Sequence, residues 1–234
     1  MKVAIVTGAS RGIGACVAQG LAQDGFSLAL TARSKGDLEK VAQSIRSANY
    51  KGVQVLTFPC DVSDSKAVSE MVASTVSKLG RIDLLVNNAG MGKTGTLAIS
   101  TEEFDEVLSV NLKGPFALLK AVVPTMKAQG DGTIINVASR AGKIGFAGWG
   151  AYAASKFGMV GLGESLYREL SPMGIRVTTL CPSWVDTDMA KGSTFPKNQM
   201  LAPEDILKSI RYIMSLSPAA SVKELMIECR AHLA

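Results

Sequence analysis

Short runs of apolar and β-branched residues alternate along this chain with longer segments in which apolar residues recur every three or four positions. The short runs have the length and composition of parallel strands that are buried on both faces. The longer segments have the period of amphipathic helices. This alternation predicts an α/β fold with a mostly parallel, seven-stranded sheet and helices on both faces. The expected strands are residues 2–7, 27–32, 54–59, 83–87, 133–138, 176–181 and 224–229.

The expected helices end near residues 23, 47, 79, 126, 170 and 215, and Asp64 is placed to cap the third of them. No internal repeat, low-complexity tract or linker interrupts the pattern, so we expect a single domain spanning residues 1–234. Residues 183–202 are polar and irregular, and we expect them to form a lid over a binding site.

Composition narrows the classes of function. The 234 residues are 47% hydrophobic and 19% charged, as in a well-packed globular protein. The net charge of +5 forms no basic stripe with interleaved aromatics, so we expect no nucleic-acid partner. No apolar run approaches the roughly 20 residues that span a membrane, so no membrane partner is expected. Because the N-terminus runs directly into a glycine motif, we expect no cleaved signal peptide and a cytoplasmic protein.

The scarcity of histidine and the spacing of cysteine disfavour two kinds of catalytic site. The chain has one histidine, His232, and four scattered cysteines without a C-x-x-C pair. Zinc-dependent dehydrogenases usually combine histidine with cysteine, and Ser-His-Asp hydrolases need a histidine. We therefore expect no metal site, and we expect the cysteines to be small buried residues in a reducing compartment.

A glycine motif, Thr7-Gly-Ala-Ser-Arg-Gly-Ile-Gly14, joins the first expected strand to the first expected helix. Gly8, Gly12 and Gly14 allow a tight turn and a close approach of a ligand to the backbone. The free N–H groups and the dipole of the helix N-terminus favour phosphate. In this position the motif predicts dinucleotide binding and a Rossmann-type, doubly wound sheet. The alternative is a structural turn without a ligand.

The end of the second expected strand indicates which dinucleotide is bound. Roughly 20 residues after the glycine motif, an acidic residue would bind the 2′-hydroxyl of the adenosine ribose of NAD. This position holds Ala32, and Arg33 follows it. A 2′-phosphate could lie against Arg33, with Arg11 as a second cation, so NADP(H) is favoured over NAD(H). The alternative is that both arginines are solvated loop residues.

Tyr152 and Lys156 lie four residues apart in an expected helix, so they share one face about one turn apart. An ammonium group near the phenol would lower the pKa of the tyrosine from its usual value near 10. Lowering it by about 3 units takes roughly 4 kcal/mol, which a charge about 4 Å away supplies at an effective dielectric constant near 20. In a site sheltered from water the pair could act as an acid or base near neutral pH. On an exposed helix it would be an ordinary surface pair.

Other polar residues follow the expected strands or interrupt a helix. Ser139 and Asp61 lie at the carboxyl ends of strands, where ligands bind in open α/β sheets, although Ser139 could equally form a turn. Asp61 could accept a hydrogen bond from an adenine amino group. The small residues 88–90 would let a cofactor lie close to the backbone. Asn111 is unusual inside a helix, and by itself it is best explained as a satisfied polar residue at a kink.

Taken together, these motifs resemble those of the short-chain dehydrogenase/reductase family along essentially the whole chain. The matching pieces stand in the family's order and spacing: residues 7–14, Asp61-Val62, Asn87-Asn-Ala-Gly90, Asn111, Ser139, Tyr152-Ala-Ala-Ser-Lys156 and residues 182–187. The resemblance implies cofactor contacts from Gly8, Ser10, Arg11, Gly12, Ile13, Gly14, Arg33, Asp61, Val62, Asn88, Ala89, Gly90, Tyr152, Lys156, Val185 and Thr187.

The resemblance also implies a catalytic tetrad. Tyr152 would protonate the forming alkoxide when a ketone is reduced by hydride from the nicotinamide. Lys156 would lower the pKa of the tyrosine and hydrogen-bond the nicotinamide ribose. Ser139 would orient the substrate carbonyl and stabilise its developing charge. Asn111 would hold a water molecule that links Lys156 to solvent.

Three segments depart from the family's patterns. Pro182-Ser183 stands where the family usually has Pro-Gly. Trp149-Gly-Ala-Tyr152 differs from the Gln-x-Asn-Tyr arrangement of the 3-oxoacyl-carrier-protein reductases, and residues 222–229 lack the glycine pair of that subgroup. We therefore expect an NADPH-dependent reductase of a small ketone or aldehyde, whose substrate stays open. A 3-oxoacyl-carrier-protein reductase, an NAD-linked alcohol dehydrogenase and a non-catalytic NADP(H) sensor are the alternatives.

The family usually assembles as dimers or tetramers through the helices that hold Asn111 and Tyr152. Gly158, Gly161 and Gly163 would let the second of these helices pack closely, and a partner helix is one candidate. We expect a homodimer or a homotetramer.

Overall fold

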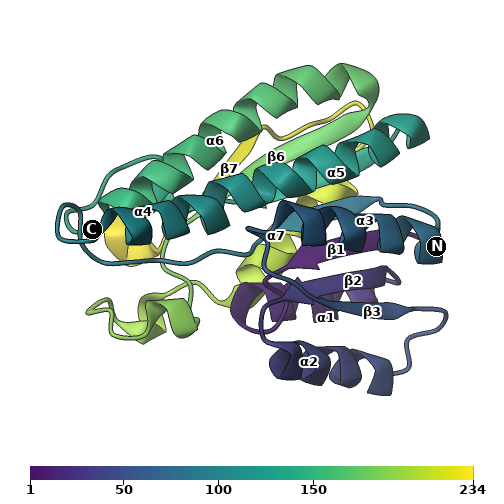
Figure 1. The fold of residues 1–234 in the computed structure, drawn as a ribbon, viewed down its shortest axis with the longest axis horizontal. Coiled ribbons are helices and arrows are strands. Elements are labelled where there is room, and N and C mark those ends of the chain that lie inside the picture. Colours follow the sequence, from purple (N-terminus) through teal and green to yellow (C-terminus); the bar gives the residue numbers. More distant parts are fainter. Residues whose placement is uncertain (234) are drawn as a thin grey trace.

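Seven strands form one sheet in the order β3-β2-β1-β4-β5-β6-β7, and all of them run parallel (Figure 1). The computed structural model describes residues 1–233. The predicted strands are confirmed, with ends that differ by one or two residues. The bounds are β1 (Val3–Thr7), β2 (Ser27–Ala32), β3 (Val55–Pro59), β4 (Leu84–Asn87), β5 (Gly132–Val137), β6 (Ile175–Pro182) and β7 (Glu224–Ile227).

The helices cover both faces of the sheet, as the alternating pattern predicted (Figure 1). One apolar cluster joins α1, α2 and α7 to one face, and a second joins α3, α5 and part of α6 to the other. The strand order runs outward from the centre in both directions, so β1 and β4 flank the point where it reverses. Ligands bind at such a point in open α/β sheets. The bounds are α1 (Gly12–Gln23), α2 (Lys35–Ser47), α3 (Ser65–Leu79), α4 (Thr101–Leu108), α5 (Gly114–Gln129), α6 (Gly150–Leu170) and α7 (Pro203–Ser215).

The single helix expected over residues 101–126 is interrupted. Residues Ser109–Lys113 form a π-helical turn between α4 and α5. Such turns are rare and occur frequently at functional sites. Asn111 lies in the middle of this one, so its unusual place inside a helix has a structural cause.

By length and composition alone, the helical stretch Thr101–Gln129 could cross a membrane. The core helix of a soluble protein passes the same test, and 44% of the most apolar window is buried inside the protein. Leu118, Val122 and Met126 of α5 belong to the same apolar cluster as Ile134 of β5. Packing on the sheet therefore accounts for the apolar character of this stretch.

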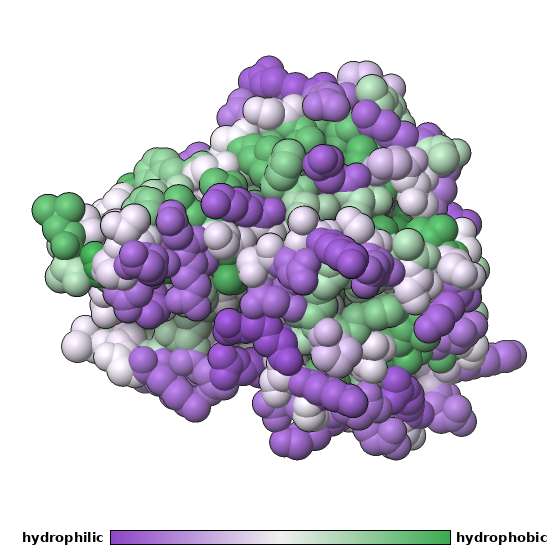
Figure 2. Space-filling view, viewed as in Figure 1, coloured by the Kyte–Doolittle hydropathy of each residue, from purple (hydrophilic) through white to green (hydrophobic). Residues whose placement is uncertain are grey.

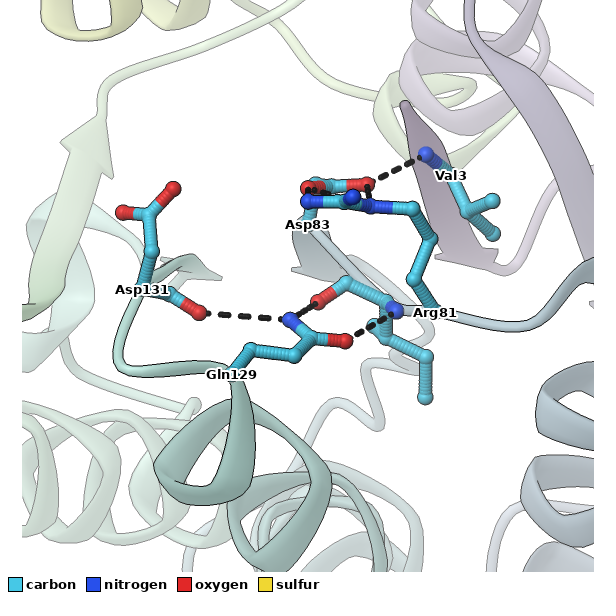
Figure 3. A network of polar contacts seen from close by, with 6 residues as sticks. Val3, Arg81, Asp83, Gln129 and Asp131 are labelled. Carbon is cyan, nitrogen blue, oxygen red and sulfur yellow. Dashed lines mark hydrogen bonds and ion pairs between the residues drawn. The ribbon is translucent and has the colours of Figure 1, made fainter. Parts of the chain in front are cut away.

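A polar network ties the amino ends of β1 and β4 together (Figure 3). Asp83 accepts a hydrogen bond from the Val3 N–H at 2.7 Å and is held by the guanidinium of Arg81 at 2.7 and 2.9 Å. The side-chain amide of Gln129 bonds both the N–H and the carbonyl of Ile82, at 2.9 and 2.8 Å. The network therefore joins the amino ends of these central strands, away from their carboxyl ends, where ligands bind.

The glycines of α6 serve mainly contacts within this chain. A Cβ on Gly158 would lie 2.8 Å from the side chain of Leu112, and one on Gly163 would lie 2.1 Å from the Thr179 hydroxyl. Gly161 alone of the three faces open space. The expected close packing is therefore confirmed for Gly158 and Gly163, which let α6 approach the π-helical turn and β6 of the same chain.

Candidate functional site

A cavity of about 800 Å³ lies where the strand order reverses, at the carboxyl ends of the strands. Its volume falls in the range of small-molecule sites, about 300–1,000 Å³. Of the predicted site residues, Gly14 and Asn111 lie outside the lining. The cavity is lined by the others: Gly8, Ser10, Arg11, Gly12, Ile13, Arg33, Asp61, Val62, Asn88, Ala89, Gly90, Ser139, Tyr152, Lys156, Val185 and Thr187.

The glycine motif makes a turn that only small residues can form. Gly8 and Gly12 have φ angles of +64° and +54°, a left-handed conformation that favours glycine. A Cβ on Gly14 would lie 2.2 Å from the carbonyl oxygen of Gly8. Asn88, which follows β4, closes the turn by donating from Nδ2 to the carbonyl of Thr7 at 2.9 Å. The turn is thus fixed by backbone contacts, and it brings β1 and β4 together.

The N-terminus of α1 is open to an anion. Arg11 precedes the helix without making a side-chain cap, and the first turn holds no acidic residue. Gly12 and Ile13 line the cavity, so the N–H groups of this first turn and the positive end of the helix dipole face it. These features fit the pyrophosphate of a dinucleotide.

The adenosine end of the cavity combines a cation with a carboxylate. Ala32, Arg33, Ser34 and Asp37 line it. Ser34 caps α2, accepting a hydrogen bond from the Asp37 N–H and donating one to the Asp37 carboxylate at 2.8 Å. Lys40 donates to the same carboxylate at 2.9 Å. Asp37 is not among the predicted site residues. Its position in the first turn of the helix that follows Arg33 is the signal that could have indicated it.

Asp61 presents a carboxylate to the cavity. It accepts hydrogen bonds from the N–H and the hydroxyl of Ser63, at 2.9 and 2.7 Å. Burial alone would raise the pKa of Asp61, but these hydrogen bonds and the charge of Arg33 together lower it. The side chain is therefore ionised at neutral pH and can accept a further hydrogen bond.

Arg11 contacts the predicted lid. Its guanidinium lies 3.6 Å from the carboxylate of Asp188, and both side chains are largely exposed. The base of this segment is held by paired bonds, because Val185 and Leu201 form a β-bridge and the Leu201 N–H donates to the carbonyl of Trp184 at 2.9 Å. The methyl group of Thr187 lies 3.1 Å from the place of a Cβ on Gly12. The segment is therefore anchored against the glycine turn.

Tyr152 and Ser139 meet at the cavity. Ser139 follows β5, and its Oγ accepts a hydrogen bond from the Ala141 N–H at 3.0 Å. Its side chain lies close enough to the hydroxyl of Tyr152 to lower the pKa of that phenol. Two hydroxyl groups from different elements therefore converge on one point, where they can hold a carbonyl oxygen.

The predicted lowering of the tyrosine pKa is wrong for this arrangement. Burial raises the pKa of Tyr152, and the nearby side chain of Ser139 offsets only part of that rise. Lys156 shares a face with Tyr152, as predicted. Its Nζ, however, donates to the carbonyl of Val137 at 3.0 Å and lies 5.6 Å from the centroid of the tyrosine ring. The spacing correctly placed the two residues on one face of the helix. The ammonium group, however, bonds a backbone carbonyl of β5.

Lys156 is 5% exposed, and burial lowers its pKa from 10.5 to about 8. Removing an ammonium group from water disfavours its charged form. Lys156 is therefore cationic at neutral pH but close to its titration range.

Asn111 lies behind the cavity wall, beside Lys156. Its Oδ1 accepts from the Met91 N–H at 2.8 Å, and its Nδ2 donates to the Met91 carbonyl at 2.8 Å and to Ser155 Oγ at 3.0 Å. A Cβ on Gly90 would lie 3.4 Å from Asn111 Oδ1 and 3.7 Å from Lys156 Nζ. The interpretation of Asn111 as a satisfied polar residue at a helix irregularity is confirmed. Its carbonyl oxygen can accept one more hydrogen bond, so the water-binding role stays a prediction.

Aromatic residues that the sequence analysis did not assign to the site line the other end of the cavity. Phe146, Trp149 and Trp184 are among them. The rings of Trp149 and Tyr152 meet edge to face, with centroids 5.8 Å apart. Trp149 precedes Tyr152 by three residues, which is one helical turn, so its spacing could have indicated this contact.

Comparisons with known proteins agree with the fold. The family model described as "short chain dehydrogenase" matches residues 2–197. A 3-oxoacyl-acyl-carrier-protein reductase of Staphylococcus epidermidis is 40% identical over 203 residues, which cover 86% of this chain and 82% of that protein.

Two solved structures are similar over nearly their whole length. A betaketoacyl-ACP reductase from Bacteroides thetaiotaomicron has a TM-score of 0.88 and 41% identity, covering 99% of this chain and 98% of that one. An alcohol dehydrogenase from the archaeon Thermococcus sibiricus, complexed with 5-hydroxy-NADP, has a TM-score of 0.90 and 35% identity, covering 98% and 97%.

The fold and the cavity define a Rossmann-type oxidoreductase that uses NAD(P)(H). The chain belongs to the short-chain dehydrogenase/reductase family. The resemblance seen in the motifs is thereby confirmed.

Proposed function

We propose that this protein is an NADPH-dependent reductase that converts a ketone or aldehyde carbonyl of a small molecule to an alcohol, with the oxidation as its reverse. The convergence of the Tyr152 and Ser139 hydroxyls beside the glycine turn carries this proposal. It puts a proton donor and a dinucleotide-binding turn in one cavity. A cytoplasmic enzyme is expected.

The roles follow from the contacts of each side chain. Bound NADPH supplies a hydride to the carbonyl carbon. Ser139 and Tyr152 hold the carbonyl oxygen, and Tyr152 gives its proton to the forming alkoxide. The raised pKa of Tyr152 keeps the phenol protonated and ready to donate. The ammonium group of Lys156 lies 5.6 Å from the centroid of the Tyr152 ring, so in this arrangement it favours the phenolate only weakly. Asn111 would hold the water that returns a proton.

The adenosine end favours NADPH over NADH. Arg33 is an exposed cation at the position where a 2′-phosphate would lie, and Ala32 leaves no carboxylate next to the ribose. The Ser34 hydroxyl has a single proton, which it donates to Asp37, so it would bond the phosphate only by giving up that hydrogen bond. Asp37 opposes this preference, because its carboxylate lies in the same part of the cavity and binds Ser34. We therefore expect a preference for NADPH that is clear but limited. Asp61 would bind the adenine, and Val185 and Thr187 the nicotinamide carboxamide.

A 3-oxoacyl-carrier-protein reductase is the second candidate. The 40% identity to such a reductase of Staphylococcus epidermidis favours it. An NAD-linked alcohol dehydrogenase fits less well, because Ala32 and Arg33 provide no carboxylate for the ribose hydroxyls. A non-catalytic NADP(H) sensor would not need Tyr152 and Lys156 together in the cavity.

We also propose a homodimer or homotetramer that uses α5 and α6. Phe116 of α5 and Phe157 of α6 are 51% and 46% exposed, and Gly161 of α6 faces open space. Figure 2 shows apolar side chains gathered over these two helices. Apolar patches of this kind mark interaction surfaces. Light scattering that finds only monomer would contradict the proposal.

Replacing Tyr152 with Phe tests the function directly. General acid catalysis contributes about 10²–10⁴-fold, so the variant should lose at least that much of kcat for carbonyl reduction. NADPH binding, followed by fluorescence, should persist because the glycine turn is unchanged. Tyr212→Phe is the matched control, because it also removes a phenolic hydroxyl, from a tyrosine of α7 that is 54% exposed. Full activity of the Tyr152→Phe variant would refute the assignment.

A further inference from the structure

Resting on the proposed reductase function, we infer that the substrate is an uncharged ketone that carries a flat aromatic or alicyclic group. This group lies against the indole of Trp149, in the cavity that apolar side chains of residues 183–202 also line. The cavity is built for this group in preference to a thioester on a phosphate-bearing carrier arm.

The substrate end of the cavity has apolar walls from two loops. Phe146 and Trp149 belong to the loop between β5 and α6, and Trp184 and Met189 belong to the segment after β6; all four line the cavity. Phe146 is 38% exposed and Met189 is 52% exposed. Large apolar side chains that line an open cavity provide the contacts that orient an apolar ligand. Both loops therefore contribute large apolar side chains to the cavity that Tyr152 lines.

Trp149 is held in place by its surroundings. A Cβ on Gly92 would lie 2.9 Å from Cζ3 of the indole, so the absence of a side chain there makes room for the ring. The Gly95 N–H donates to the carbonyl of Gly148 at 2.6 Å, which joins the loop before α4 to the loop before α6. The indole is thus a flat, fixed surface at 5.8 Å from the ring of Tyr152, measured between centroids.

The position of Trp149 determines where a substituent can go. Because the indole lies 5.8 Å from the ring of Tyr152, a substituent of a carbonyl held at the hydroxyls of Tyr152 and Ser139 can reach it. Aromatic rings gain from stacking or edge-to-face contact with tryptophan in addition to the gain from burying apolar area. A planar ring next to the carbonyl therefore fits this wall better than a flexible alkyl chain.

Most of the charges around this end of the cavity are paired, and Asp188 serves two cations, Arg11 and Lys191. The three loops at residues 88–100, 139–149 and 183–202 contain five cationic side chains. Each of them forms an ion pair with a carboxylate: Lys93 with Glu103, Arg140 with Glu228, Lys143 with Glu224, Lys191 with Asp188 and Lys197 with Asp186. Recognition of a phosphate group uses lysine or arginine whose charge is available. The paired loops therefore favour a neutral substrate.

Steady-state kinetics with saturating NADPH tests the inference on three carbonyl compounds: α-tetralone, butanone and acetoacetyl coenzyme A. One added apolar group in a hydrophobic pocket changes kcat/KM by about 10–200-fold. We expect kcat/KM for α-tetralone to exceed the values for the other two by about tenfold or more. The Trp149→Ala variant should reduce the ratio of α-tetralone to butanone by about tenfold, mainly through KM.

Three further variants separate the loss of the indole contact from a loss of folding. Trp149→Phe keeps an aromatic ring at this position, so the ratio of kcat/KM for α-tetralone to that for butanone should stay close to its original value. Gly92→Ala leaves the tryptophan in the chain but displaces the indole, so it should reduce the ratio as well. Tyr212→Ala removes an exposed aromatic side chain of α7 outside the cavity and should leave the ratio unchanged.

The outcomes distinguish this inference from the proposed function. Higher kcat/KM for acetoacetyl coenzyme A than for α-tetralone, or equal losses on both ketones in the Trp149→Ala variant, would overturn the substrate class and leave the reductase function standing. No turnover of any of the three compounds by protein that binds NADPH would overturn the reductase function and the substrate class together.

Discussion

The two ends of the cavity are built in different ways. At the cofactor end, the turn after β1 and the N-terminus of α1 present backbone atoms, and glycines at positions 8, 12 and 14 allow their close approach. At the substrate end, side chains such as Trp149 and Met189 project from loops that two separate strands carry. A backbone site tolerates few changes, whereas a side-chain site can change with each substitution. This contrast explains why the sequence motifs indicate the cofactor but not the substrate, whose binding depends on the side chains of the loops.

The largest effect on cofactor binding is expected from a change to the backbone site. A methyl group on Gly14 would lie 2.2 Å from the Gly8 carbonyl, so Gly14→Ala must move the turn away from α1. Overpacking of this kind costs about 1–3 kcal/mol, and the displaced turn should weaken NADPH binding by about 100-fold or more. Fluorescence titration and thermal unfolding measure the two effects.

Gly36→Ala is the matched control for that experiment. A Cβ on Gly36 meets nothing within 4 Å, and the residue lies in the first turn of α2. The variant should be as stable as the original protein or slightly more so, because alanine loses less backbone entropy on folding. Equal behaviour of the two variants would show that the glycine turn is not sterically fixed.

At the adenosine end of the cofactor site, side chains determine the preference between NADPH and NADH. Arg33→Asp replaces the cation by a carboxylate, so the ratio of kcat/KM for NADPH to that for NADH should fall by about 10–100-fold, or about 1.4–2.7 kcal/mol. An unchanged ratio would remove Arg33 from the phosphate site. Asp37→Asn removes the opposing carboxylate and should raise the same ratio a few-fold. The two variants therefore move one ratio in opposite directions.

The smallest expected effect concerns pH and the catalytic pair between the two ends. Burial lowers the pKa of Lys156 from 10.5 to about 8, so its ammonium group is present below that pH and is lost as pH rises through it. The kcat/KM for carbonyl reduction, which reports on the free enzyme, should fall up to tenfold per pH unit above about 8. Lys156→Arg stays charged over this range, so its remaining activity should fall off only at higher pH. If kcat/KM fell at the same pH in the Lys156→Arg variant as in the original protein, the titration would belong to another group.

Local patterns in the sequence determined the sheet, the glycine turn and the position of the cavity. Strand periodicity and turn sterics act over a few residues, so the strand bounds and the conformations of Gly8 and Gly12 could be predicted. The capping of α3 by Asp64 was predicted for the same reason, and the structure confirms it. The i, i+4 spacing likewise placed Tyr152 and Lys156 on one face.

Contacts between segments far apart in sequence determined how the side chains of the site are oriented. The direction of the Lys156 ammonium depends on a carbonyl of β5. The side chain of Asn111 in the π-helical turn bonds Met91 and Ser155, which are far away in sequence. The wall at Trp149 exists because Gly92 leaves room for it. No local pattern encodes such pairs, because each requires the fold to bring two remote segments together. The sequence alone therefore identified the family and predicted the residues of its site, and only the tertiary structure determined the shape of the cavity.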